Sequence, residues 1–233
     1  YEISAWIYRV VVQSNNMFST WLHEHGYNTD DKKRYKLFSF SNLNIFPYKI
    51  DKTTQTIRSE GNRVSLGVSF YGNEAVEHFV IGLFQNQTFD LGNKQLKPVR
   101  LRVVNVEKLA NPTFSTIQIF SAQTAINISR QVEQNKAADY LNPYDDGYKK
   151  ILLNGIVHKY EAAANHLKNL PSFPDLHSLL DWKCLSPADK VNMKLITMKA
   201  YTSAETRVKG FQYDFELTAP LEIQKLVYLG GMG

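Results

Sequence analysis

Residues 208–229 have the sequence VKGFQYDFELTAPLEIQKLVYL. Apolar side chains alternate through residues 208–217, and this alternation predicts a strand with one buried face. That face carries Phe211, Tyr213, Phe215 and Leu217. Pro220 then suits the first turn of a helix, which we expect to end near Leu229. A strand followed at once by a helix is therefore the unit around which the rest of the fold is predicted.

The same unit occurs earlier in the chain, in residues 63–84. Residues 63–70 alternate as a strand, and Asn73 is expected to cap a helix that continues to Phe84. In the rest of the first half we predict helices at 3–13 and 17–23, strands at 35–40, 44–50 and 96–106, and a polar, turn-rich segment at 53–62. In the second half we predict β-structure at 114–120, a helix from Pro143 to Leu167 that ends before Pro171 and Pro174, and a strand at 192–201.

The order of these elements predicts an α+β fold of two tandem ferredoxin-like (RRM-like) domains. A break at Asn111 and Pro112 separates an expected first domain, residues 1–109, from an expected second domain, residues 113–233. The first half lacks the opening strand of such a unit and the second half lacks the closing one. Because the chain also begins with Tyr1 and ends in glycines, we expect it to be part of a longer protein. A single α+β domain is the alternative that periodicity leaves open.

Composition excludes several classes of protein. With 43% hydrophobic residues among 233, the chain can bury a sizeable core, which excludes the disordered and fibrous classes. The longest apolar run, residues 226–233, is far shorter than the ~20 residues that cross a bilayer, so no membrane partner is expected. The single cysteine, Cys184, excludes a disulfide framework and indicates the reducing cytoplasm. The formal charge of +5 is spread evenly and does not by itself indicate nucleic acid.

Short motifs along both halves of the chain carry a resemblance to a known family. The motifs are Ile7-Tyr8, Trp21-Leu22-His23-Glu24, Tyr35-Lys36-Leu37-Phe38-Ser39-Phe40-Ser41, Tyr148-Lys149-Lys150, Val208-Lys209-Gly210-Phe211 and Phe215-Glu216-Leu217 with Pro220, followed by the closing glycines. In this order and spacing, the chain resembles the CRISPR repeat-processing endoribonucleases, the Cas-six family. The resemblance implies a pair of ferredoxin-like domains, which agrees with the fold predicted above from the residues.

The resemblance also implies an activity and a partner. Such an enzyme cuts the repeat RNA of the precursor CRISPR transcript, without a metal or other cofactor, to release guide RNAs. The RNA 2′-hydroxyl attacks the adjacent phosphate and leaves a 2′,3′-cyclic phosphate and a 5′-hydroxyl. By position in the motifs, the family's catalytic residues correspond to Tyr8, His23 and Lys36, with Lys32 and Lys33 as nearby alternatives for the lysine. A homodimer and a CRISPR interference complex are further partners that the resemblance leaves open.

Contacts with RNA phosphates are expected from cations and from the closing glycines, because glycine lets backbone N–H groups approach an anion closely. The candidates are Lys32, Lys33, Arg34, Lys149, Lys150, Arg207, Lys209, Gly231 and Gly233. Arg207 and Lys209 are favoured because they flank the strand that leads towards the glycines. The alternative for each cation is an ordinary solvated position on the surface.

The three catalytic candidates suit the implied reaction. An ordinary histidine pKa of ~6.5 suits His23 as the acid that protonates the leaving 5′-oxygen, and Lys36 supplies positive charge to the phosphorane. Tyr8, with an ordinary pKa of ~10, acts as a base only if a nearby cation lowers that pKa, and otherwise positions the 2′-oxygen. Taken singly, each has a structural alternative: a core aromatic for Tyr8, a capping residue for His23 and a solvated strand residue for Lys36.

This site requires a break in the chain between Tyr8 and His23. One straight helix would hold the two residues ~22 Å apart, too far to share a phosphate. The cap-forming residues at 14–16 are where we expect the turn. His25 is the substitute for His23, and since side chains two positions apart on a helix point in different directions, the pair is not expected to bind a metal. The alternative functions are a repeat-RNA-binding protein of the same fold that does not cleave, and an α+β scaffold.

Overall fold

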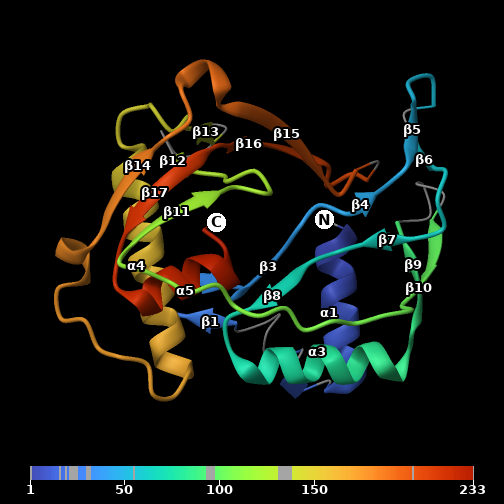
Figure 1. The fold of residues 1–233 in the computed structure, drawn as a ribbon, viewed down its shortest axis with the longest axis horizontal. Coiled ribbons are helices and arrows are strands. Elements are labelled where there is room, and N and C mark those ends of the chain that lie inside the picture. The colour runs from blue at the N-terminus through green and yellow to red at the C-terminus, as the bar shows by residue number, and fades with distance from the viewer. Residues whose placement is uncertain are drawn as a thin grey trace.

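The computed structural model describes residues 2–15, 17–18, 20, 26–29, 33–54, 56–92, 98–130, 138–200 and 202–232. In Figure 1, most of the first half of the chain lies on the right and the second half lies on the left. Both halves mix helices with antiparallel strands, as the α+β prediction requires.

Two helices of the first half, α1 (Glu2–Ser14) and α3 (Asn73–Gln85), pack against each other. The helix predicted at 3–13 is confirmed, and Ile7 and Val10 on its inner face are buried in the core. The close approach of the helices depends on Gly82 of α3, since a Cβ atom there would overlap the backbone oxygen of Val10. Only glycine therefore fits where the two main chains meet.

The strands of the first half are short and pair in antiparallel ladders. β3 (Phe38–Phe40) pairs with β8 (Val68–Phe70), β4 (Asn44–Ile45) pairs with β7 (Val64–Ser65), and β5 (Tyr48–Asp51) pairs with β6 (Thr56–Ser59). The remaining ladders join β1 (Tyr27–Asn28) to β2 (Arg34–Tyr35) and β9 (Thr88–Leu91) to β10 (Val99–Arg102). The first three ladders run from the centre of the molecule to its right edge in Figure 1.

The second half is built on a three-stranded antiparallel sheet with the order β11–β17–β14. Its strands are β11 (Ile117–Ser121), β17 (Asp214–Thr218) and β14 (Asp181–Cys184). The other elements are α4 (Tyr148–His166), α5 (Leu221–Gly230), the long hairpin of β15 (Asn192–Met198) and β16 (Thr206–Gln212), the short pair β12 (Ser129–Arg130) and β13 (Asp139–Tyr140), and the 3-10 helices η1 (Leu176–Leu179) and η2 (Ala188–Lys190). Tyr148 of α4 packs on Trp182 of β14, with ring centroids 5.3 Å apart.

The stretch at 208–217 folds as two strands, and the prediction of a single strand there was wrong. β16 pairs with β15, whereas β17 lies between β11 and β14, so the chain changes partners at Tyr213. The Tyr213 hydroxyl is hydrogen-bonded to the Tyr148 hydroxyl inside the core. This buried contact holds the residue between the two ladders. The predicted alternation is nevertheless confirmed, because every side chain of the apolar face is buried.

Several strand boundaries in the first half also differ from the prediction. The strand expected at 35–40 is interrupted between β2 and β3, and those expected at 44–50 and 63–70 each divide in two. Segment 53–62 contains β6, because the Asp51 carboxylate accepts the N–H groups of Thr53 and Thr54 and closes a hairpin turn. Strand β9 was not predicted, and the strand expected at 96–106 is limited to β10 in the described residues.

Helix starts were predicted less well than helix faces. The helix expected from Pro143 begins at Tyr148, because the Asp145 carboxylate accepts the Asn142 N–H at 2.7 Å and holds the preceding residues in turns. Asn73 is the first residue of α3 and does not cap it, since the cap position is Gly72. The last helix begins after Pro220, as predicted. Of the short helix expected at 17–23, residues 17, 18 and 20 are helical and the others lie outside the described residues.

The two halves meet through α5 and α4. Helix α5 packs on β3 and β8, where the Ser69 hydroxyl donates to the Leu229 carbonyl at 2.9 Å and the Tyr71 hydroxyl donates to Glu222 at 2.7 Å. On the other side, β1 packs against α4, and Asn165 donates to the Asn28 carbonyl at 3.3 Å. Of the helices in the described ranges, none has both the length and the apolar character needed to cross a bilayer.

The α1–α3 contact gives the first prediction. Gly82→Ala should lower the free energy of unfolding by about 1–3 kcal/mol, because the added methyl group forces the two helices apart. Gly155→Ala on α4 is the matched control, since nothing lies within 4 Å of its Cβ position. That control should be stabilising by about 0.5–1 kcal/mol. Urea denaturation of both variants measures the difference, and equal effects would contradict the close packing described here.

Candidate active site

Tyr8 and Lys36, two of the three catalytic candidates, lie next to each other. Lys36 is in the interruption between β2 and β3, and its Nζ atom is 4.7 Å from the centre of the Tyr8 ring. The Tyr8 ring in turn packs edge-on against Phe38, with centroids 5.6 Å apart. The break in the predicted strand therefore coincides with the place where the lysine stands over the tyrosine.

Partial loss of solvation shifts the pKa of both residues. It raises the pKa of Tyr8 well above the usual tyrosine range, and the neighbouring Lys36 does not offset that rise. Tyr8 is therefore a neutral phenol near pH 7, able to donate a hydrogen bond and poorly suited to accept a proton. Loss of solvation also lowers the pKa of Lys36. Lys36 is nevertheless exposed, and an anion bound beside it would favour its charged form.

Helix α1 ends at Ser14, so the break that the site requires is present. The Asn15 side-chain oxygen accepts the Phe18 N–H at 2.9 Å and caps the helical residues that follow. His78 of α3 holds this turn, with Nδ1 3.0 Å from the Ser14 hydroxyl and Nε2 3.4 Å from the Asn15 amide nitrogen. His78 carries no catalytic motif and has no metal-ligand spacing in the sequence, so this structural role was not predicted. His23 itself lies outside the described residues, as do its neighbours at 21–25.

The glycine-rich end of the chain lies against β3. A Cβ atom on Gly230 would be 3.7 Å from the Leu37 Cα atom, and one on Gly231 would be 3.4 Å from the Ser39 hydroxyl. Leu37 directly follows Lys36. Gly231, a predicted RNA-binding residue, is thus close to the strand that begins beside the catalytic lysine candidate. Gly233 lies outside the described residues.

A buried lysine lies beneath these glycines. Lys159 of α4 is 3% exposed, and its Nζ atom donates to the carbonyl oxygens of Gly230 at 3.0 Å and Gly231 at 2.8 Å. Burial lowers the pKa of Lys159 to about 8. The sequence reasoning missed this residue. Its spacing from Leu152 and Ile156 places it on the buried stripe of the helix, and that spacing was a signal available in the sequence.

The predicted RNA-binding cations that the structure describes lie in three different parts of the fold. Lys33 and Arg34 are exposed just before Lys36, whereas Lys32 lies outside the described residues. Lys149 forms an ion pair with Asp181 at the start of α4, and Lys150 is exposed beside it. At ~1.5 Å per residue, these two lie ~15 Å along the helix from Lys159.

Two further cations lie on the long hairpin of the second half. Arg207 and Lys209 are exposed on β16, and Arg207 is 3.7 Å from Glu205. The strand that carries these two cations therefore belongs to the β15–β16 hairpin, and it is not part of the three-stranded sheet that contains β17.

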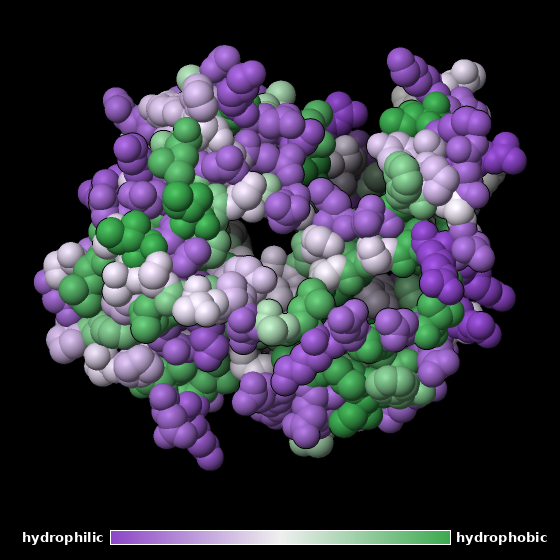
Figure 2. Space-filling model, in the orientation of Figure 1, coloured by the Kyte–Doolittle hydropathy of each residue, from purple (hydrophilic) through white to green (hydrophobic). Residues whose placement is uncertain are grey.

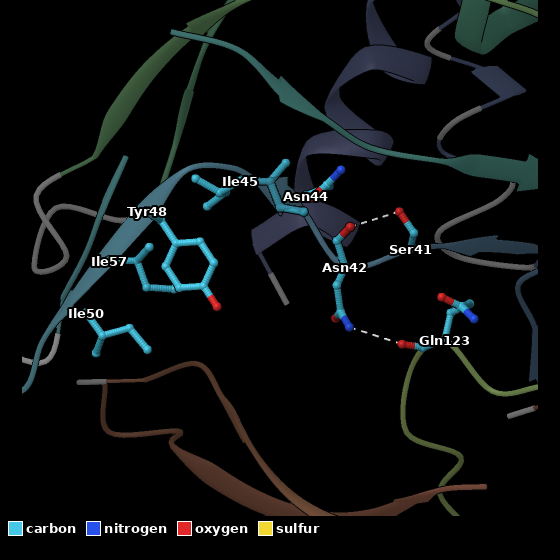
Figure 3. A pocket seen from close by; sticks show the side chains of 9 residues that line it. Ser41, Asn42, Asn44, Ile45, Tyr48, Ile50, Ile57 and Gln123 are labelled. Atoms are coloured by element: carbon cyan, nitrogen blue, oxygen red, sulfur yellow. Dashed lines mark hydrogen bonds between the residues drawn. The ribbon is translucent and has the colours of Figure 1, made fainter. Parts of the chain in front are cut away.

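An open cavity of about 560 Å³ lies between the two halves, lined by residues 41–45, the β5–β6 hairpin and Gln123. Figure 3 shows Tyr48, Ile50 and Ile57 of that hairpin on one side, while the Asn42 amide donates to the Gln123 carbonyl at 3.0 Å on the other. Figure 2 shows the surrounding face hollowed near its middle, with polar residues beside the hollow. An aromatic ring beside apolar side chains and amide groups suits a planar, polar-edged molecule such as a nucleotide base.

Within the described ranges, no three histidine, cysteine or acidic side chains are grouped as metal ligands would be. The structure brings together the Tyr8 phenol and the Lys36 ammonium group, and it places the glycine-rich segment against Leu37 and Ser39, which follow Lys36 in the chain.

Comparison with known proteins assigns the chain to a family. The model of the family described as CRISPR-associated protein Cas6, N-terminal, matches residues 1–102, and that of CRISPR associated protein Cas6, C-terminal, matches residues 109–233. The chain belongs to the Cas6 family. The predicted resemblance and the α+β fold of two ferredoxin-like domains are both confirmed by this membership and by solved structures.

Individual relatives of this Cas6 chain are distant in sequence. CRISPR-associated endoribonuclease Cas6 1 of Methanocaldococcus jannaschii is 26% identical over 165 residues, which cover 71% of this chain and 59% of that relative. The structure of a Cas6-related gene product from Pyrococcus furiosus matches with a TM-score of 0.76 and 18% identity, over 100% of this chain and 84% of the other. A RAMP protein described as binding different RNA substrates matches with a TM-score of 0.74 and 16% identity, over 100% and 85%.

Proposed function

We propose that this Cas6 protein is a metal-independent endoribonuclease that cleaves CRISPR repeat RNA in the precursor transcript and so produces guide RNAs. The observation that supports the proposal is that the Lys36 ammonium group lies 4.7 Å from the centre of the Tyr8 ring. Leu37, the residue after Lys36, lies against Gly230. A phosphate in transesterification needs a cation and a hydrogen-bond donor, and a glycine-rich backbone that can approach it closely. The relative from M. jannaschii, named an endoribonuclease, supports the same activity.

In the proposed reaction the RNA 2′-oxygen attacks the adjacent phosphorus atom and the bond from phosphorus to the 5′-oxygen breaks. The products are a 2′,3′-cyclic phosphate and a 5′-hydroxyl. Lys36 stabilises the negative charge that develops on the phosphate oxygens. His23 donates its proton to the leaving 5′-oxygen. The proton of the 2′-hydroxyl passes to solvent water.

Tyr8 positions the RNA in this reaction and does not act as the base. The raised pKa of Tyr8 keeps the phenol protonated near neutral pH, so it donates a hydrogen bond to the 2′-oxygen or to the phosphate. Of the two roles that the sequence left open for Tyr8, its environment favours the positioning role.

RNA binding is proposed to extend from this site across both halves. Lys33 and Arg34 adjoin Lys36 in sequence, and Arg207 and Lys209 lie on the exposed hairpin of the second half. The proposed set of phosphate contacts is completed by Lys32, Lys149, Lys150, Gly231 and Gly233. We propose that the boundary between the two domains lies between residues 109 and 113.

We further propose that the enzyme works in the cytoplasm, since its single cysteine suits a reducing compartment. Repeat RNA is its proposed partner. A CRISPR interference complex and a second copy of this chain are further proposed partners.

The central experiment incubates the protein with the repeat RNA of its own CRISPR array in EDTA. Cleavage should persist in EDTA, and His23→Ala should lower the single-turnover rate by ~10²–10⁴-fold, the usual range for a lost general acid, while binding is retained. His25→Ala is the matched control and should cleave at close to the wild-type rate. Loss of cleavage in EDTA contradicts metal independence. Tight binding without any cleavage would instead support the alternative function, an RNA-binding protein that does not cleave. The similar RAMP structure, described as binding different RNA substrates, is compatible with that alternative.

The assignment of Tyr8 gives a prediction about pH. Because the pKa of Tyr8 is raised, its phenol does not ionise between pH 6 and pH 9. Tyr8→Phe should therefore lower the cleavage rate by a constant factor across this range and leave the shape of the pH profile unchanged. A basic limb that is present in the wild type and absent from Tyr8→Phe would instead assign Tyr8 as the base.

A further inference from the structure

Lys159 is unusual because it is the one buried lysine or arginine among the residues that the structure describes. A buried cation is destabilising unless it is well compensated. The carbonyls of Gly230 and Gly231 supply part of this compensation, since both accept from the Lys159 ammonium group at 3.0 Å or less. The lysine comes from α4, whereas the carbonyls belong to the end of α5 and the residue that follows it.

The position of the ammonium group explains why it is tolerated there. The last carbonyl groups of a helix have no partner within the helix, and the C-terminal end of a helix is electrostatically negative. The Gly231 N–H closes the last turn of α5 by donating to the Val227 carbonyl at 3.1 Å. Lys159 then satisfies the carbonyls of Gly230 and Gly231, which the helix itself leaves open.

This contact fixes the direction of the next amide group. The peptide bond between Gly231 and Met232 is trans, so the Met232 N–H points opposite to the Gly231 carbonyl. Since that carbonyl points at Lys159, the Met232 N–H points away from the core. Gly231 allows this geometry because its φ of 75° is one that other residues rarely adopt.

We propose that Lys159 is a positioning residue, which turns the carbonyls of the glycine segment inward and thereby presents the Met232 amide to an RNA phosphate. The inference rests on the function proposed above and adds to it a residue that never touches the RNA. An outward backbone N–H beside a glycine is a common element of anion-binding backbone. The segment also contacts Leu37 and Ser39, so the amide is presented beside the strand that follows Lys36.

The test compares two buried polar residues that both donate to backbone carbonyls. Lys159→Met removes the ammonium group, and Gln224→Met removes a buried amide of α5 that donates to the Leu217 carbonyl at 2.8 Å, away from the glycines. Binding of repeat RNA with a 2′-deoxynucleotide at the cleaved position should weaken about tenfold for Lys159→Met, as for the loss of one hydrogen bond to a charged group. It should change less than twofold for Gln224→Met. Equal weakening in both variants would make Lys159 merely structural and overturn the inference.

A second measurement needs no variant and serves if Lys159→Met does not fold. The chain has 4 methionines, so selective ¹⁵N labelling gives one amide signal each for Met17, Met193, Met198 and Met232. Adding the same RNA should shift the Met232 signal in the wild-type protein. A Met232 signal that stays in place while the RNA is bound overturns the inference and leaves the proposed function intact. Failure of the wild type to bind or cleave repeat RNA would instead overturn the proposed function itself.

Discussion

The contact between the last turn of α5 and strand β3 is the interaction on which the site depends. Gly230 lies against Leu37 on one side, and its carbonyl is held by the buried Lys159 on the other. The glycine segment is therefore fixed between a helix of the second half and a strand of the first. This contact places backbone of the second half against Leu37, the residue that directly follows Lys36.

Desolvation decides how Tyr8 can work. It raises the pKa of Tyr8 and so keeps the phenol as a hydrogen-bond donor. It also lowers the pKa of the exposed Lys36, and a phosphate bound beside this lysine would favour its charged form. The site is thus suited to bind a negatively charged group that changes its charge distribution during the reaction, which fits phosphodiester cleavage by an internal nucleophile.

The sequence predicted faces better than boundaries, and there is a physical reason. The alternation of buried side chains in 208–217 continues although the chain changes its strand partners at Tyr213. Burial depends on the face of the strand to which a side chain points, and it does not depend on which neighbouring strand is paired. The break after Ser14 was predictable because Asn15 caps locally. The interruptions of the other strands depend on ladders between distant segments, such as β3 with β8, which no local pattern encodes.

The candidate site was predicted in part for the same reason. Tyr8 and Lys36 came from motifs, and their adjacency is a result of folding. Lys159 and His78 were not predicted because each acts on backbone or capping groups that become neighbours only in the fold.

Attack by the RNA 2′-oxygen can be tested with repeat RNA that carries a single 2′-deoxynucleotide on the 5′ side of the cut. We expect this RNA to bind within about twofold of the all-ribose RNA and to stay intact, since its nucleophile is gone. Cleavage of the substituted RNA at the same bond would rule out the proposed transesterification.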